Sequence, residues 1–288
     1  MGADADHVTW SALLAQTTEQ LGDANEARWL CEHASGLDGA EFVAGLGEFA
    51  TTAMVESLEG MMRRRLAGEP LQYVMRRWAF RHLDVLIDER VLIPRPETEV
   101  LVDIALELVR GVEAPRIVDL GTGSGVIGLS LAGELYPKVG EVWLVDASAA
   151  ALEVARANIA GIGRAGAVVR VAQGDWFAAL HEELRGHLDM VVANPPYIAE
   201  GDDEVEESVV RWEPSSALFS GAVGLDAIRR IVADAPAWLR SGGWLVMEMG
   251  YRQGDAVRAL FDSSWSSVAV KRDLAGRDRF VVAQYLTK

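Results

Sequence analysis

Residues 191–200 read VVANPPYIAE, so an apolar run ends in an amide, two prolines and a phenol. Each proline disfavours a helical conformation in the residue before it, which stiffens the backbone here. Two acceptors follow each other, the Asn194 side-chain oxygen and the Pro195 carbonyl, and the Tyr197 ring can lie flat over a planar group. We therefore predict Asn194, Pro195 and Tyr197 as catalytic residues, and the same three together with Pro196 as substrate-binding residues.

Two acceptors in one plane suit the NH2 group of a planar system, either the exocyclic amine of a base or a carboxamide. Such a nitrogen is a poor nucleophile because its lone pair is delocalised. An enzyme can hold both N–H bonds and aim the lone pair at a sulfonium methyl group, so that positioning and electrostatics supply most of the acceleration. No Ser–His or Cys–His arrangement is evident, and the histidines show no metal-ligand spacing, so we expect no metal.

A glycine-rich loop, DLGTGSG, occupies residues 119–125 between an apparent strand and a helix. Glycines allow a tight turn and a close approach of the backbone to a ligand. The G-x-G-x-G spacing differs from the dinucleotide fingerprint G-x-G-x-x-G, and Asp119 would repel a pyrophosphate but attract an ammonium group. Both features favour S-adenosylmethionine over NAD. The predicted cofactor-binding residues of this loop are Asp119, Gly121, Thr122, Gly123, Ser124 and Gly125.

Acidic residues also end the next two strands. Asp146, in LVDAS, stands about 20 residues beyond the loop, where a carboxylate can bind both ribose hydroxyls. In GDW, Asp175 could accept a hydrogen bond from the adenine amine, and Trp176 could pack on the ring. Taken alone, each carboxylate could be an ordinary strand end and Trp176 a core residue. Following the glycine loop in this order, they favour a cofactor site, to which Asn194 should also point.

The elements that must position these residues alternate between strands and helices from residue 115 onward, which is typical of a mostly parallel sheet covered on both faces. Residues 266–276 and 278–286 indicate two final strands joined by a turn, hence one antiparallel strand. We therefore predict an α/β, Rossmann-like methyltransferase domain with a seven-stranded sheet. In such sheets ligands bind at the carboxyl ends of the strands, where Asn194 stands.

The preceding part of the chain has a different pattern. Residues 10–66 show apolar spacings of three and four with glycine breaks, which predicts a small bundle of short helices. Gly68 and Pro70 end this pattern, two short strands follow, and Pro96 suits the first turn of a helix. The predicted domains are an N-terminal helical bundle over residues 1–75, a β-hairpin linker over 76–95 and a methyltransferase domain over 96–288.

The bulk composition narrows the partners. The net charge of −16 argues against binding nucleic-acid phosphates, although Arg63, Arg64 and Arg65 form either a solvated helix face or a docking surface for an acidic partner. Cys31, the single cysteine, cannot form an internal disulfide. Residues 1–10 lack the pattern of a secretory signal or of myristoylation, and no apolar run reaches the ~18 residues of a membrane span. We expect a cytoplasmic monomer.

With these motifs in order, the chain resembles the release factor glutamine methyltransferases, the HemK/PrmC family, from about residue 68 to the C-terminus. GEPLQYV, LIPRPETE, WEPSSALFSG, MEMGYRQ and DLAGRDR match the ordered motifs of that family. The sequence NPPY is shared with adenine-N6 DNA methyltransferases and some RNA methyltransferases, whereas IPRPETE and DLAGRDR are far more specific. The chain departs from the pattern at Arg76 and Arg77, after GEP, and at Trp212, where the family usually has tyrosine.

The resemblance implies transfer of a methyl group from S-adenosylmethionine, with S-adenosylhomocysteine as product, to the glutamine amide of the Gly-Gly-Gln motif in bacterial peptide chain release factors. It implies that the residues of NPPY hold this glutamine and that Arg95 to Thr98 lie near the methionine end of the cofactor or near the substrate loop, with Arg95 as a substrate-binding residue. The alternatives are an adenine-N6 DNA or RNA methyltransferase, a ribosomal-protein glutamine methyltransferase, and a cofactor-binding adaptor without activity.

Overall fold

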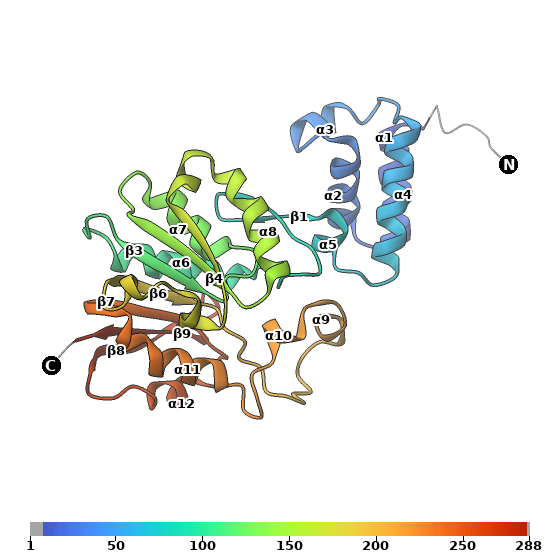
Figure 1. Ribbon diagram of the computed structural model, residues 1–288. Helices are drawn as coiled ribbons and strands as arrows, with labels where there is room; N and C mark the ends of the chain where they lie inside the picture. The colour runs from blue at the N-terminus through green and yellow to red at the C-terminus, as the bar shows by residue number, and fades with distance from the viewer. Residues whose placement is uncertain (1–7, 287–288) are drawn as a thin grey trace. The chain divides into compact units, whose positions relative to one another are not determined.

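The computed structural model describes residues 8–286 (Figure 1). The chain divides into two compact units, residues 1–76 and 77–288. The two short strands that we predicted within a linker, residues 76–95, therefore lie in the second unit. The residues on which the expected lack of a secretory signal and of myristoylation depends lie mostly outside the described part. Within residues 8–286, no helix is long and apolar enough to cross a membrane.

The first unit is a bundle of short helices with a core of its own. Side chains of Thr9, Asp23 and Thr51 accept hydrogen bonds from the first turns of three helices, as N-cap residues do. The rings of Trp10 and Phe42 pack edge to face in the core, with their centroids 5.9 Å apart. The helices are α1 (Trp10–Leu21), α2 (Ala24–Ser35), α3 (Ala40–Ala44), α4 (Thr52–Leu66) and α5 (Leu71–Met75).

The arginines of α4 are bound mainly within this unit. Arg64 donates to Glu69 at 2.8 Å and to the carbonyls of the segment that follows. Arg65 donates two hydrogen bonds, of 2.7 and 3.0 Å, to the Glu26 carboxylate of α2. The Arg63 side chain is 73% exposed and lies 3.9 Å from Glu59. Arg64 and Arg65 therefore tie helices together, which leaves Arg63 as the part of the cluster that projects into solvent.

The second unit is built on a seven-stranded sheet of order β5-β4-β3-β6-β7-β9-β8. The strands β3 to β7 run parallel, while β9 pairs antiparallel with both β7 and β8, which confirms the predicted fold class. A separate hairpin, β1 (Arg77–Phe80) and β2 (Leu83–Leu86), precedes the sheet. The sheet strands are β3 (Arg116–Leu120), β4 (Glu141–Asp146), β5 (Val169–Gln173), β6 (Leu188–Ala193), β7 (Leu239–Glu248), β8 (Trp265–Arg272) and β9 (Asp278–Tyr285).

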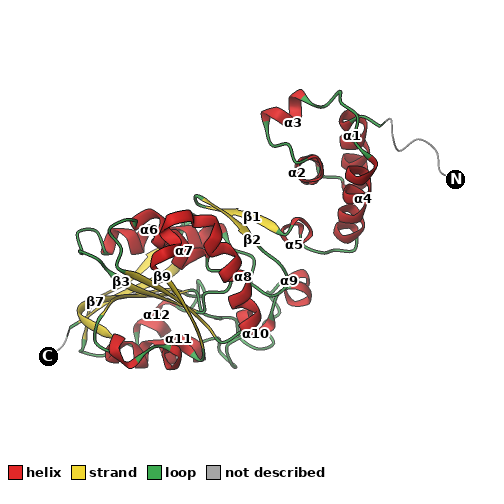
Figure 2. Ribbon diagram, turned by 45° about the horizontal axis from the view of Figure 1, so that its top comes forward, coloured by secondary structure: helices red, strands yellow, loops and turns green. Residues whose placement is uncertain are grey.

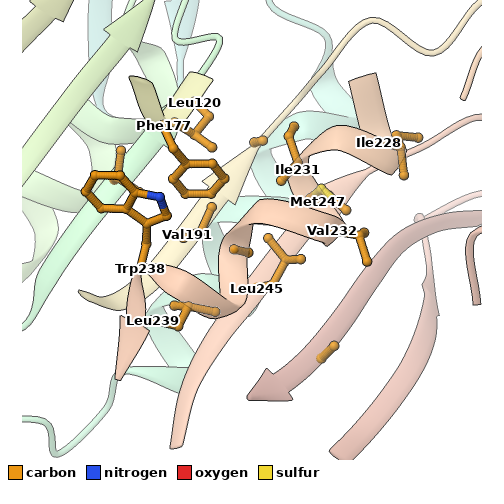
Figure 3. Close-up of a cluster of buried hydrophobic side chains, with 14 of the residues drawn as sticks. Leu120, Phe177, Val191, Ile228, Ile231, Val232, Trp238, Leu239, Leu245 and Met247 are labelled. Atoms are coloured by element: carbon orange, nitrogen blue, oxygen red, sulfur yellow. The ribbon is translucent and has the colours of Figure 1, made fainter. Parts of the chain in front are cut away.

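Helices cover both faces of this sheet, so the central strands are buried on both sides and need continuous apolar sequences. All six residues of β6 are buried. On one face lie α6 (Pro96–Leu108), α7 (Val126–Leu135) and α8 (Ala149–Ile159), and on the other α11 (Asp226–Asp234) and α12 (Gly254–Arg258) (Figure 2). On the face that α11 covers, Phe177 and Trp238 stack with their ring centroids 5.8 Å apart, within a large apolar cluster that also includes Ile231 (Figure 3).

The order of the strands creates a crevice at one point. Strand β3 pairs with β4 on one side and with β6 on the other. The connection after β3 therefore runs toward one edge of the sheet, and the connection after β6 runs toward the other edge. The loops beyond β3 and β6 part there, and ligands of open α/β sheets bind at such a switch point. Two short helices that we did not expect, α9 (Glu207–Trp212) and α10 (Ser215–Leu218), follow β6 on this side.

Candidate active site

A cavity of about 240 Å³ opens at this switch point, beyond the carboxyl ends of β3, β4 and β6. Its wall contains most of the residues that the sequence predicted, together with Ser216 and Ala217 from the region of α10. Asp119, Gly125, Pro195, Tyr197 and Arg95 do not line it. The predicted residues that do line it are Gly121, Thr122, Gly123, Ser124, Asp146, Asp175, Trp176, Asn194 and Pro196.

The glycine loop depends on the absence of side chains. Gly121 has a φ of +70°, and a Cβ there would lie 3.3 Å from the indole of Trp176. Trp176 itself has a φ of +50°, a conformation that bulky residues seldom adopt. Such strain persists only where the surroundings impose it, and it is common at ligand sites. The loop and the indole are therefore packed together as one wall of the cavity.

Asp119 lies beneath the glycine loop and shapes it. The side chain is fully buried, and its Oδ2 accepts from the Thr122 hydroxyl at 2.6 Å and from Gly128 N at 3.0 Å. Burial raises the pKa of this carboxyl to about 7, against the opposing effect of those hydrogen bonds. Oδ1 has no hydrogen-bond partner within residues 8–286. A direct interaction of Asp119 with an ammonium group stays a prediction.

Asp146 stands at the cavity wall with its orientation fixed. One carboxylate oxygen accepts from Gly123 N and the other from Ser148 N, both at 2.9 Å. Each carboxylate oxygen keeps a free lone-pair direction, so the group can still accept from two vicinal hydroxyls. Asp175 is held less closely, since its side chain is 64% exposed and lies 3.6 Å from Arg230. These residues fit a ribose and an adenine.

Asn194 belongs to a hydrogen-bonded chain that reaches into the sheet. Its Nδ2 lies 3.4 Å from the Thr98 hydroxyl, which lies 2.8 Å from Glu248 Oε2. The other carboxylate oxygen of Glu248 accepts from the Tyr197 hydroxyl at 3.1 Å. Burial raises the pKa of Glu248, opposed by the Thr98 hydrogen bond and the charge of Arg279. Burial also raises the pKa of Tyr197, so its phenol stays protonated and donates.

Arg95 has a partner inside the protein. Its guanidinium contacts Glu213 at 2.5 Å, and the other oxygen of Glu213 accepts from Ile93 N at 3.0 Å. The Glu213 side chain is 2% exposed. The motifs IPRPETE and WEP, far apart in sequence, are therefore joined, and the pair holds the segment from which Pro94 and Thr98 line the cavity. A contact between Arg95 and the substrate stays a prediction.

Sequence reasoning missed Glu248 and Glu213, and it placed Thr98 only near the cofactor or substrate. A signal for Glu248 was present, since it is the single charged residue after the apolar run WLVM at the end of a buried strand. A carboxylate at that position needs buried partners. For Glu213, the sequence offered only its position in the motif WEP, which does not predict the contact with Arg95. No group of three or more His, Cys, Asp or Glu residues able to hold a metal occurs in the described chain.

Two family models match the chain, the PrmC N-terminal domain over residues 12–75 and the methyltransferase small domain over residues 98–213. A release factor glutamine methyltransferase of Xylella fastidiosa (strain 9a5c) is 42% identical over 274 residues, which cover 95% of this chain and 97% of that protein. One of Vibrio cholerae serotype O1 is 36% identical over 288 residues, with 98% of each chain covered.

Among solved structures, the hMettl16 catalytic domain in complex with MAT2A 3'UTR hairpin 6 superimposes with a TM-score of 0.52 at 15% identity, covering 82% of each chain. At that identity the likeness concerns the fold alone. It shows that the chain shares this fold.

Proposed function

The chain belongs to the family of release factor glutamine methyltransferases, and on this premise we propose that it methylates the side-chain amide nitrogen, N5, of the glutamine in the Gly-Gly-Gln motif of peptide chain release factors. The observation that carries the proposal is the position of Asn194. It lies at the cavity wall directly after the buried strand β6, with the Pro195 carbonyl next to it. Two acceptors beside a cofactor cavity match the two N–H bonds of a carboxamide.

The residues of the cavity fit S-adenosylmethionine, which supplies an electrophilic methyl group on a sulfonium when bound. Asp146 would hold the ribose hydroxyls, Asp175 and Trp176 the adenine, and the glycine loop would bring its backbone against the methionine part. Two carboxylates, Asp146 and Asp175, and one guanidinium, Arg90, line the cavity, and this excess of negative charge suits a cationic ligand. Because the Trp176 indole packs against Gly121, the two residues would form one wall against the bound cofactor.

The chemistry requires the protein to position the glutamine nitrogen. Asn194 and Pro195 accept its two N–H bonds, which aims the lone pair, while Tyr197 lies over the plane of the amide. S-adenosylmethionine, when bound, would supply the methyl group as its bond to sulfur breaks, and the nitrogen held by Asn194 and Pro195 would form the C–N bond and give one proton to solvent. No general base is needed beforehand, because the lone pair is already present. Positioning and electrostatic fit therefore supply the acceleration.

The adenine-N6 alternative uses the same two acceptors with a flipped base in place of glutamine. The net charge of −16 opposes association with a nucleic acid. The relatives at 36–42% identity that are named above are all release factor enzymes. We further propose that the enzyme is a monomer, since the glycine loop and both acceptors come from one chain. We also propose that it acts in the cytoplasm, since Cys31, its single cysteine, is buried and cannot form an internal disulfide. A ribosomal-protein glutamine is the remaining protein substrate to exclude.

Substrate class can be tested with labelled S-adenosylmethionine in separate reactions that contain unmethylated release factor, ribosomal proteins, duplex DNA or structured RNA. We expect label on the release factor only. Label on adenine in nucleic acid would contradict the proposed substrate while leaving the cofactor site intact. Label on ribosomal protein in preference to release factor would contradict the proposed substrate and favour a glutamine of a ribosomal protein.

We also propose that the first unit recognises the body of the release factor, away from the methylated loop. Its support is that residues 1–76 form a separate unit with a core of their own, centred on Trp10, Leu30 and Phe42. Among the residues that the structure describes, those that line the cofactor cavity all belong to the second unit.

Removing residues 1–76 should raise KM for intact release factor by at least about tenfold, which corresponds to ~1.4 kcal/mol of binding. The remaining unit should keep its affinity for S-adenosylmethionine, since it contains the whole cavity. Steady-state kinetics and calorimetry measure the two quantities. An unchanged KM in a truncated protein that still binds the cofactor would contradict this role for the first unit.

A further inference from the structure

The carboxylate of Glu248 lies next to the acceptor site without lining the cavity. Ala193 of β6 pairs with Met247 of β7, so Asn194 and Glu248, one residue beyond each, end neighbouring strands. Glu248 is 1% exposed and receives two hydroxyl groups, Thr98 at 2.8 Å from α6 and Tyr197 at 3.1 Å from the loop after β6. A buried carboxylate placed this way organises the groups that donate to it.

The Thr98 hydroxyl has one proton, and its position decides which way the neighbouring amide faces. With the proton directed to Glu248, the Thr98 oxygen can only accept from Asn194. The group that meets it at 3.4 Å must then be Nδ2. That distance is long for a hydrogen bond, so the contact is weak and its main effect is on the orientation of the Asn194 amide. The Asn194 oxygen is left without a partner in the described chain, free for the substrate.

We infer that Glu248 is a positioning residue: through the Thr98 hydroxyl it orients the Asn194 amide so that the oxygen, and not the NH2 group, faces the substrate nitrogen. This inference deepens the proposed function and depends on it. Without an acceptor at Glu248, the Thr98 proton would turn to the Asn194 oxygen. The amide would then rotate and present its own NH2 group to the NH2 group of glutamine, where neither can accept.

The same carboxylate also fixes the second wall of the acceptor site. The Tyr197 hydroxyl, which cannot reach solvent easily, donates to the remaining oxygen of Glu248. Around this group the charged residues are Arg279 from β9 and Glu97 from α6. One buried group therefore couples α6, β7 and the NPPY loop, and places Asn194 and Tyr197 relative to each other.

Two pairs of variants test the inference. Glu248→Leu removes both acceptors and should lower kcat by at least about tenfold, because the reversed amide is favoured by a hydrogen bond. Glu248→Gln can turn its oxygen to Thr98 and its NH2 group to Tyr197, so it should stay within about fivefold of the natural chain. Thr98→Val removes the hydroxyl, so neither orientation of the Asn194 amide is favoured and kcat should fall by less than in Glu248→Leu, while Thr98→Ser, which keeps the hydroxyl, should keep the activity of the natural chain.

The readouts separate positioning from packing. Glu248→Leu leaves the buried Tyr197 hydroxyl without its acceptor and removes a charge near Arg279, so it should also lower thermal stability. Cofactor affinity in the folded variant should hold while kcat falls. If Glu248→Leu does not fold, the Thr98 pair decides. Full activity in Glu248→Leu or Thr98→Val would overturn the inference. Equal losses in Glu248→Leu and Glu248→Gln would also overturn it, because charge and not hydrogen bonding would then matter. Failure of the natural chain to label release factor would contradict the proposed function itself.

Discussion

Replacing Asn194 with alanine is expected to lower kcat by about two to three orders of magnitude, the usual loss when one well-placed polar group of a preorganised site is removed. The Asn194 oxygen has no partner in the described protein, so its binding capacity is reserved for the substrate. Its loss leaves one N–H of the glutamine amide unsatisfied and the lone pair free to point away from the methyl group. Initial-rate kinetics with saturating release factor measure the change.

The control for Asn194→Ala is the same protein's affinity for S-adenosylmethionine. Asn194 forms only one part of a wall that also contains Gly121, Asp146 and Trp176. Cofactor affinity should therefore change by less than about threefold while kcat falls, the pattern of an interaction made in the transition state. A kcat close to that of the natural chain would remove Asn194 from the chemistry.

Gly224→Ala is expected to lower kcat by about a hundredfold, the cost that a displacement of about 1 Å can impose on reacting groups. Gly224 has a φ of +69°, and a Cβ there would lie 2.2 Å from the backbone oxygen of Tyr197. The Gln253 side chain, which donates to that same oxygen at 3.0 Å, blocks the way on the other side. The NPPY backbone must therefore shift, and the Pro195 and Asn194 acceptors shift with it.

Gly221→Ala provides a matched control three residues away. Gly221 has the same φ of +69°, so the backbone strain of the two substitutions is equal. The nearest obstacle is the Asp226 carboxylate, whose side chain is 64% exposed and can rotate aside. We expect Gly221→Ala to lose stability like Gly224→Ala but to keep kcat within about threefold. Equal kcat losses in both variants would show that strain, and not the NPPY backbone, sets the effect.

The sequence predicted the architecture of the second unit well, because its strands and helices have distinct periodicities. RIVDL and LDMVVA are short apolar runs closed by glycines or prolines, which is how buried parallel strands look. The helices α9 and α10 were missed because they are six and four residues long, too short for a hydrophobic stripe. Helix α5 was missed because it has five residues and because Gly68 and Pro70 suggested the end of a helix and not the start of another.

The site residues that stand at the ends of strands could be predicted from their order in the sequence. The residues that depend on contacts between distant segments could not. The strand-end residues Asp146 and Asn194 line the cavity as their position in an α/β sheet implies. Whether Asp119 meets the ligand or sits beneath the loop depends on the packing of α7, which no local pattern encodes. The chain from Asn194 through Thr98 to Glu248 spans three elements, so its members gain meaning only when the sheet brings them together.

The most direct measurement is peptide mass spectrometry of unmethylated release factor after incubation with the enzyme and S-adenosylmethionine. The account predicts a gain of one methyl group on the glutamine of the Gly-Gly-Gln motif, placed by fragmentation on the side-chain amide. After the same short incubation, Asn194→Ala should give about a hundredth of that gain or less. A methyl group on any other residue, or one transferred equally well by Asn194→Ala, would contradict it.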